Sequence, residues 1–235
     1  MKSILSLIAL TCFLCGSASA LDIAALERAM ANPDRSEEDK ARDASRQAPQ
    51  VLDFLGLEAG MTVLDINASA GWYTEVLSYA VGSEGKVYMQ NRPGGRSADA
   101  IAARAARLPN VERWETAISD LPANSVDFAI TGLNLHDFHN ADPQVAQGIL
   151  TQVLGALKPG GILGVIDHEG DPGVDNAELH RIAFDEAVMA LTQAGFALVG
   201  VSDVLDNPAD DHSVAQFDPS VRGKTDRIVL KLVKL

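Results

Sequence analysis

Cysteine is almost absent from this sequence of 235 residues, and both cysteines, Cys12 and Cys15, stand among the first 20 residues. Residues 21–235 therefore contain no thiol. This excludes disulfide bonds, cysteine nucleophiles and thiolate metal ligands from that part of the chain. A domain without such links depends on its hydrophobic core for stability, and the length is sufficient for one substantial core.

Residues 1–20 have the layout of a secretory signal peptide. Lys2 supplies a positive start, residues 4–14 form an apolar segment, and Ala18-Ser19-Ala20 is a small-residue cleavage site. The residues before the two cysteines do not form a lipoprotein signal, so we expect no stable membrane anchor. The predicted mature chain begins at residue 21 and is exported, to the periplasm or to the medium.

Basic residues and long apolar runs are also scarce. The chain has 19 Lys and Arg against 32 Asp and Glu, a net charge of −13. This charge disfavours nucleic acids and anionic membranes as partners, because both would repel the protein. After residue 20 no apolar run reaches the roughly 18 residues that a membrane helix needs. The length favours a single domain, with a helical cover at 21–60 and an α/β core at 61–235.

Strand and helix patterns alternate from residue 62 onward. The predicted strands are 62–65, 86–90, 111–115, 126–131, 161–167, 196–204 and 227–233. Between them we expect helices at 71–81, 97–108 and 184–194 and one opened by Asp142-Pro143, after N-terminal helices at 21–30 and 36–55. Repeated strand–helix units predict a parallel sheet with helices on both faces. Only a polar loop, 206–226, separates the last two strands, which predicts one antiparallel strand near the edge.

Residues 62–73 combine a buried strand, a small-residue loop and the start of a helix. Asp65 ends the strand, and the loop carries Asn67, Ser69 and Gly71. Such a loop offers backbone N–H groups to an anionic or nucleotide-like ligand. The segment resembles motif I of the class I S-adenosylmethionine (SAM)-dependent methyltransferases, which has glycine at these three loop positions. Asparagine tolerates left-handed backbone well, so Ser69 is the larger departure.

Further short motifs extend this resemblance over nearly the whole mature chain. They are similar to those of a subset of exported bacterial SAM-dependent methyltransferases. The matching segments are Arg42-Asp43, Arg46, residues 71–75, residues 85–88, Asn134-x-His136, Val165-x-Asp167-His168, Asn207-Pro208 and Thr225-Asp226-Arg227. The resemblance implies an α/β, Rossmann-like class I methyltransferase fold with a seven-stranded, mostly parallel sheet, and it implies SAM as cofactor.

The same resemblance implies which residues hold SAM. Motif I would surround the methionine part, and the end of the second strand, Gln90-Asn91, would bind the ribose. That strand end lacks the usual carboxylate, and an amide acceptor is expected to cost about 1–2 kcal/mol of binding. The cofactor-binding candidates are Asp65, Asn67, Ser69, Gly71, Gln90, Asn91, Asp120 as an adenine contact, and Asn134.

Acid–base side chains gather at the predicted exits of the fourth and fifth strands. We predict His136 as a general base oriented by Asp137, with His168 as the second candidate, because histidine titrates near neutral pH. Alternatively, these histidines cap loops and bond to neighbouring backbone. A metal site is a further alternative, with the possible ligands His136, Asp137, His139, Asp167 and His168. No standard ligand spacing is present, so our prediction includes no metal.

The leading interpretation is an exported SAM-dependent methyltransferase that acts on a small molecule. The main alternative is a non-catalytic ligand-binding protein on the same fold, because SAM is made in the cytosol and its supply outside is not assured. A hydrolase that uses the histidine–aspartate cluster is a third, weaker interpretation, since the sequence has no Gly-x-Ser-x-Gly nucleophile elbow.

Overall fold

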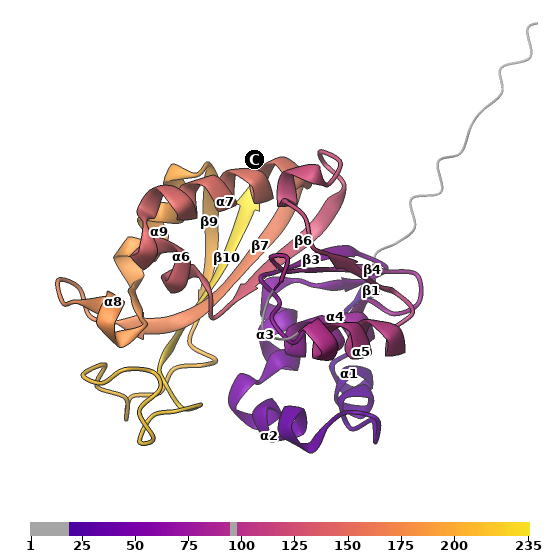
Figure 1. Cartoon of the computed structure of the whole chain (residues 1–235), viewed down its shortest axis with the longest axis horizontal. Helices are drawn as coiled ribbons and strands as arrows, with labels where there is room; N and C mark the ends of the chain where they lie inside the picture. Colours follow the sequence, from indigo (N-terminus) through magenta and orange to yellow (C-terminus); the bar gives the residue numbers. More distant parts are fainter. Residues whose placement is uncertain (1–18, 95–97) are drawn as a thin grey trace, which may run out of the picture.

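The computed structural model describes residues 19–94 and 98–235 (Figure 1). The predicted signal peptide, apart from Ser19 and Ala20, and both cysteines lie outside the described residues, as does Ser97, the predicted start of a helix. Within the described part, no helix is both long and apolar enough to cross a bilayer.

A twisted sheet forms the centre of the molecule. In spatial order its strands are β5 (Val111–Trp114), β4 (Lys86–Gln90), β3 (Thr62–Ile66), β6 (Val126–Gly132), β7 (Leu157–Gly170), β10 (Arg227–Lys234) and β9 (Phe196–Ser202). The first five are parallel to one another, whereas β10 is antiparallel to both β7 and β9. This confirms the predicted fold class, including the single antiparallel strand near the edge. Two short pairings add β8 (Ile182–Ala183) to β7 and β1 (Ser19–Ala20) to β2 (Glu58–Ala59).

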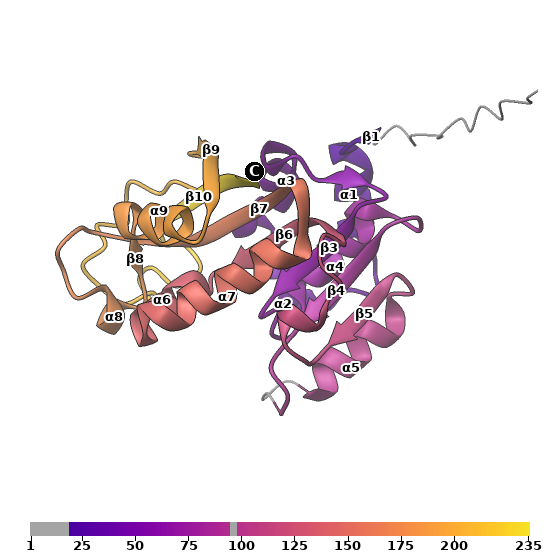
Figure 2. The same ribbon diagram turned by 90° about the horizontal axis from the view of Figure 1, so that it is seen from above.

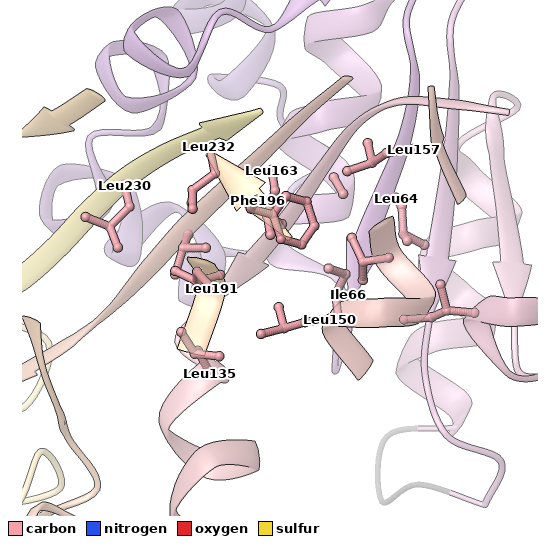
Figure 3. Close-up of a cluster of buried hydrophobic side chains, with 14 of the residues drawn as sticks. Leu64, Ile66, Leu135, Leu150, Leu157, Leu163, Leu191, Phe196, Leu230 and Leu232 are labelled. Carbon is pink, nitrogen blue, oxygen red and sulfur yellow. The ribbon is translucent and has the colours of Figure 1, made fainter. Parts of the chain in front are cut away.

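Helices cover both faces of the sheet (Figures 1 and 2). On one face lie α1 (Ile23–Met30), α3 (Ala48–Leu55), α4 (Trp72–Val81) and α5 (Ala98–Arg107), and on the other α6 (Leu135–Ala141), α7 (Pro143–Ala156) and α9 (Phe184–Gln193). Each face has its own buried cluster. Figure 3 shows the cluster under α7 and α9, in which Leu150 and Leu191 meet Leu163 of β7 and Leu230 of β10.

The strand order reverses at β3. The chain passes from β3 outward to β4 and β5, then returns to place β6 on the other side of β3. In open α/β sheets a ligand crevice lies beyond the carboxyl ends of the strands at such a point. The fold therefore predicts a ligand site at the carboxyl ends of β3, β4 and β6.

The predicted helix 36–55 is wrong as a single element. Helix α2 (Glu37–Arg46) ends at Gln47, which has a left-handed φ of 41°, and α3 begins at Ala48. Pro49 explains the break, because a proline inside a continuous helix donates no N–H and its ring clashes with the carbonyl four residues earlier, whereas proline is tolerated in the first turn of α3. The Gln47 side chain stabilises the junction by donating a hydrogen bond to the carbonyl of Val204, at 2.8 Å.

Two further elements differ from the sequence prediction. The segment after β6, expected to be a loop, contains α6, which places several candidate site residues on a helix. Strand β7 also begins at Leu157, earlier than the predicted 161, and continues to Gly170. A short helix, α8 (Asn176–Leu179), follows it.

Candidate active site at the ends of β3, β4, β6 and β7

The loop between β3 and α4 has three residues in left-handed conformation. The φ angles are 50° at Asn67, 53° at Ser69 and 83° at Gly71. At Gly71 a Cβ atom would approach Cε of Met89 to 2.5 Å, so this position requires glycine. Asn67 and Ser69 adopt the backbone shape that glycine prefers, in spite of their side chains.

Gln90 and Asn91 at the end of β4 hold this loop in place. The Asn67 N–H donates to Oε1 of Gln90 at 2.9 Å, and the Ser69 N–H donates to Oδ1 of Asn91 at 2.8 Å. Asn91 returns a hydrogen bond from Nδ2 to the Ser69 carbonyl. The two predicted ribose ligands therefore use their side-chain oxygens on the loop backbone.

Asp65 is buried beneath the loop and bonds to α4. Its Oδ2 accepts a hydrogen bond from Thr74 Oγ1 at 2.6 Å. Burial raises the pKa of the Asp65 carboxyl from 3.8 to about 7, and the bonds from Thr74 only partly oppose this rise. Close to neutral pH this carboxyl is thus balanced between its neutral and charged forms, and a nearby cation would favour the charged form.

A cavity of about 120 Å³ lies beside the loop, and its wall carries charge of both signs. Asp65 contributes a carboxyl group, and Arg42 and Arg46 of α2 contribute guanidinium groups. The Arg46 guanidinium lies 4.5 Å from the ring centroid of Trp72, and it has no ion pair or hydrogen bond with any other described residue. Burial lowers the pKa of Arg46, since its charge lacks a directly bound counter-ion.

Two aromatic residues at the start of α4 close this cavity. Trp72 donates Nε1–H to the carbonyl of Asp39 at 2.9 Å, which ties α4 to α2. Tyr73 packs against Gly132 of β6 so closely that a Cβ there would lie 2.7 Å from its ring. The pair therefore fixes the distance between the helical cover and the strand ends.

A second cavity, of about 320 Å³, lies on the other side of Asn67. Its wall includes Ile66, Gln90, Ile118 and Phe138, a mainly apolar setting. Asn67 lines both cavities, so they lie next to each other along the ends of β3, β4 and β6, and we call the two together the elongated crevice. A larger hollow of about 720 Å³ lies at the opposite, amino ends of β4 and β5, where the fold predicts no ligand.

Asn134 and Asp120 differ in their relation to this crevice. Asn134 lines the smaller cavity and accepts a hydrogen bond from Nδ2 of Asn67 at 3.0 Å, which joins the β3 loop to the β6 exit. Asp120 is exposed and is not part of either cavity wall. The neighbouring Ala117 and Ile118 line the 320 Å³ cavity instead.

His136 is held between two carboxylates. Its Nδ1 lies 2.6 Å from Oδ1 of Asp167 in β7, and its Nε2 lies 3.1 Å from Oδ1 of Asp137. Burial lowers the pKa of His136, but the bonds to Asp137 and Asp167 outweigh it and raise this pKa to about 10. The ring is therefore charged near neutral pH. The predicted role as general base would first require one carboxylate to move away.

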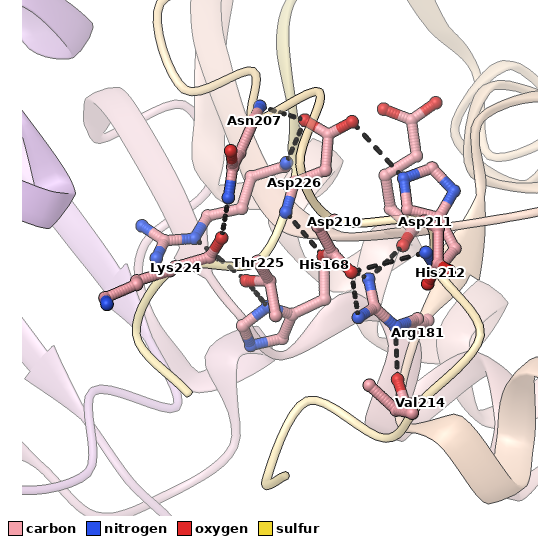
Figure 4. Close-up of polar contacts among 12 residues, drawn as sticks. His168, Arg181, Asn207, Asp210, Asp211, His212, Val214, Lys224, Thr225 and Asp226 are labelled. Carbon is pink, nitrogen blue, oxygen red and sulfur yellow. Dashed lines mark hydrogen bonds and ion pairs between the residues drawn. The ribbon is translucent and has the colours of Figure 1, made fainter. Parts of the chain in front are cut away.

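His168 has a different environment from His136. Its Nδ1 lies 2.6 Å from Oγ1 of Thr225, as Figure 4 shows. Burial lowers the pKa of His168 to about 3, so the ring is uncharged and a weak base. His139, a possible ligand in the metal alternative, has a buried Nδ1 without a partner among the described residues.

The long loop 206–226 is fastened to the end of β7 by buried ions. Arg181 donates two hydrogen bonds to Asp210, both at 2.9 Å, and one to the carbonyl of Val214 (Figure 4). Oδ2 of Asp210 also accepts from the backbone N–H of Asp226. Asp210 is thus an anchor of the loop.

Sequence reasoning missed the importance of Arg46, Tyr73 and His180. The structure places the first two on the crevice wall, and it brings His180 to within 3.4 Å of Asp137 through the C-terminal end of α8. Arg46 and Tyr73 both left a signal in the sequence, since Arg46 is one of the motif matches before the first strand and Tyr73 belongs to the match at residues 71–75.

The arrangement of elements resembles that of known structures. A SAM-dependent methyltransferase from Aquifex aeolicus matches with a TM-score of 0.64 and 23% identity, over 91% of this chain and 99% of that chain. One from Mesorhizobium loti matches with a TM-score of 0.59 and 16% identity, over 82% and 100%. The [4+2]-cyclase SpnF matches with a TM-score of 0.60 and 21% identity, over 90% and 92%.

Models of protein families and curated proteins gave no match to this sequence. These three structural matches are below 25% identity, and they extend over most of both chains. Together with the strand order and the position of the crevice, they establish that the chain has the fold of the class I SAM-dependent methyltransferases.

Proposed function

We propose that the protein is an exported SAM-dependent methyltransferase that acts on a small molecule. Three observations support this: the fold, the elongated crevice at the switch point of the sheet, and the two fold neighbours named as SAM-dependent methyltransferases. The unpaired Arg46 opposite the buried Asp65 carries the proposal, because a small cavity with both charges suits a free amino acid group.

The crevice fits the two ends of SAM. In the 120 Å³ cavity, Arg46 and Arg42 would pair with the carboxylate of the methionine part, and Asp65 would accept hydrogen bonds from its ammonium group. The apolar wall of the 320 Å³ cavity, with Ile118 and Phe138, would hold the adenine ring. This volume is within the range of about 300–1,000 Å³ that is usual for small-molecule sites.

The chain supports methyl transfer mainly by alignment. Bound SAM supplies an electrophilic methyl group. Asp65 and Arg46 fix one end of the crevice, while Trp72 and Tyr73 exclude water from it. Of the two predicted bases, His136 is already charged and His168 is a weak base. The site therefore favours an acceptor atom that needs no strong base, and positioning provides the rate.

Calorimetric titration of the mature protein with SAM and with its demethylated product S-adenosylhomocysteine tests the proposal. We expect one site for each. In Arg46→Gln, both affinities should fall about 10- to 100-fold, because a charge-assisted hydrogen bond contributes about 1.5–3 kcal/mol. Lys40→Gln is the control on the same helix, since within residues 19–94 and 98–235 Lys40 pairs only with the exposed Glu37. If the wild-type protein binds neither compound, the proposed function is wrong.

A ligand-binding protein without methyltransferase activity is the second candidate. The side-chain oxygens of Gln90 and Asn91, which would accept bonds from the ribose, are already bonded to the loop. A fold neighbour named as a [4+2]-cyclase also shows that proteins of this fold have other activities. Native mass spectrometry of protein purified from its own compartment distinguishes the two, because a co-purified ligand other than SAM or its product favours the second candidate.

The proposed export has its own test. The mass of the protein recovered from the periplasm or the medium should correspond to a chain that begins at Leu21. Recovery of the uncleaved chain in the cytosol would contradict export and would leave the proposed methyl transfer standing.

A further inference from the structure

Two histidines and an aspartate converge at the ends of β6 and β7. His136 and Asp137 belong to the first turn of α6, and His180 follows α8, which lies beside α6 (Figure 1). One potential ligand atom from each of the three lies within 4.8 Å of the other two. Elements far apart in the sequence therefore bring together side chains that commonly bind metal ions.

The spacing of these atoms suits a common metal. His136 Nε2 lies 3.1 Å from Asp137 Oδ1, and His180 Nδ1 lies 3.4 Å from the same oxygen. Zinc binds imidazole nitrogen and carboxylate oxygen at about 2.0–2.2 Å in tetrahedral geometry, which places its ligand atoms about 3.3–3.5 Å apart. Only small side-chain movements are needed to centre an ion between the three groups.

Asp167 orients His136 from behind. Its Oδ1 contacts Nδ1 of His136 at 2.6 Å, and its Oδ2 accepts the backbone N–H of the same residue at 2.8 Å. A carboxylate on the far nitrogen of a metal-binding histidine is the usual outer support of such sites, because it fixes the ring and increases its basicity. Here it directs Nε2 toward Asp137 and His180.

The cluster is separate from the proposed SAM crevice and open on one side. Phe138, which lines the 320 Å³ cavity, lies two residues after His136, so the two side chains project from nearly opposite sides of α6. The His136 side chain is 2% exposed, whereas those of Asp137 and His180 are 49% and 43% exposed. A bound ion would keep at least one position open to water or to another oxygen ligand.

We propose that His136, Asp137 and His180 bind a divalent transition-metal ion, with zinc as the reference ion. Two imidazoles and one carboxylate favour zinc, cobalt or nickel over magnesium or calcium, which prefer ligand sets made of oxygen. In the metal-free protein, hydrogen bonds join these side chains to each other, and the ion would replace them. The site does not depend on the proposed methyl transfer.

Zinc titration by calorimetry, and cobalt titration by visible absorption, test the site in the full mature chain. We expect one zinc per chain and a cobalt spectrum of low coordination number. His180→Ala should weaken zinc binding at least 100-fold. Asp167→Asn should weaken it about 10- to 100-fold, as is usual for an outer carboxylate. Circular dichroism shows whether each variant is folded.

His212→Ala is the matched control, because His212 also lies between two carboxylates, those of Asp171 and Asp226. This variant should bind zinc as the wild-type protein does. Equal losses in His180→Ala and His212→Ala, or no zinc binding by the folded wild-type protein, would overturn the proposal. A SAM titration of the same samples reports on the proposed methyltransferase function independently.

Discussion

Ser69 shows at the scale of one residue how the loop keeps its shape without glycine. Its φ of 53° lies in the left-handed region, which costs a residue with a side chain roughly 1–2 kcal/mol. Two hydrogen bonds with Asn91 hold it there: the Ser69 N–H donates to Oδ1 of Asn91, and the Ser69 carbonyl accepts from Nδ2 of Asn91. The resemblance to motif I implies glycine at this position, and the positive φ of Ser69 is a backbone conformation that glycine adopts readily.

A substitution series at Ser69 measures this strain. Ser69→Gly should increase the free energy of unfolding by about 1 kcal/mol, because glycine adopts positive φ without a steric penalty. Ser69→Ala keeps the Cβ atom and should not stabilise the protein. Thermal unfolding of the three proteins gives the order, and a stabilised alanine variant would contradict the strain. Under the proposed function, Ser69→Gly should also bind SAM more tightly, because the loop then has more room.

Asp65 should make stability depend on pH. Its pKa is raised by burial from 3.8 to about 7, so between these values the folded protein holds a proton that the unfolded chain has lost. The contribution of Asp65 to stability therefore falls as the pH rises from about 4 to 7, by about 1.4 kcal/mol for each pH unit.

Asp65→Asn removes this dependence while it keeps the shape of the side chain. The free energy of unfolding of the variant minus that of the wild-type protein should be larger at pH 8 than at pH 5. Chemical unfolding of both proteins at both pH values measures this difference. Asp120→Asn is the control, because Asp120 is exposed. A difference between Asp65→Asn and wild type that does not change with pH would show that Asp65 is ionised throughout.

At the scale of elements, the junction of β4 with the β3 loop depends on hydrogen bonds from the loop backbone to the side chains of Gln90 and Asn91. Gln90→Leu should destabilise the protein by about 1–3 kcal/mol, because the Asn67 N–H loses its acceptor in a partly buried place. Gln152→Leu is a matched control, since Gln152 accepts the Ser119 N–H in an exposed setting. Urea unfolding of both variants checks the difference. Equal losses would mean that water replaces Gln90 at the loop.

The same elements show how far the sequence could predict the fold and the site. Strands β3, β4 and β6 were predictable because buried parallel strands form short apolar runs between turn residues. Helix α6 was not predictable from Leu135-His136-Asp137, because a short segment with few apolar residues has no helical periodicity. The folding back of Gln90 and Asn91 was also hidden, since residue type shows possible hydrogen bonds but not which partner is near. His180 lies close to Asp137 because α8 packs beside α6, and this packing is not visible in the sequence.

At the scale of the whole molecule, Arg104 of α5 joins the helical cover to the core. Its guanidinium bonds to Asp39 of α2 at 2.7 Å, to the carbonyl of Ala70 at 2.6 Å, and to Glu75 of α4, which is fully buried. No sequence pattern linked these positions, because they meet only after α2 has packed across the end of the sheet. The cover and the core therefore share one set of buried charges.

Arg104→Met tests this coupling. The change should destabilise the protein by about 2–4 kcal/mol, because Asp39 and Glu75 lose a buried partner while keeping weaker ones in Arg42 and Arg107. Arg107→Met is the control, with an expected loss of about 1 kcal/mol or less. Arg107 is partly exposed, and its substitution leaves the ion pair between Glu75 and Arg104 intact. Trp114 also fluoresces, so both variants are made in a Trp114→Phe background. Far-ultraviolet circular dichroism and the fluorescence of Trp72, which is bonded to α2, should then show one common transition in each variant. A loss of stability in Arg104→Met no larger than that in Arg107→Met would contradict the coupling of the cover to the core through Arg104.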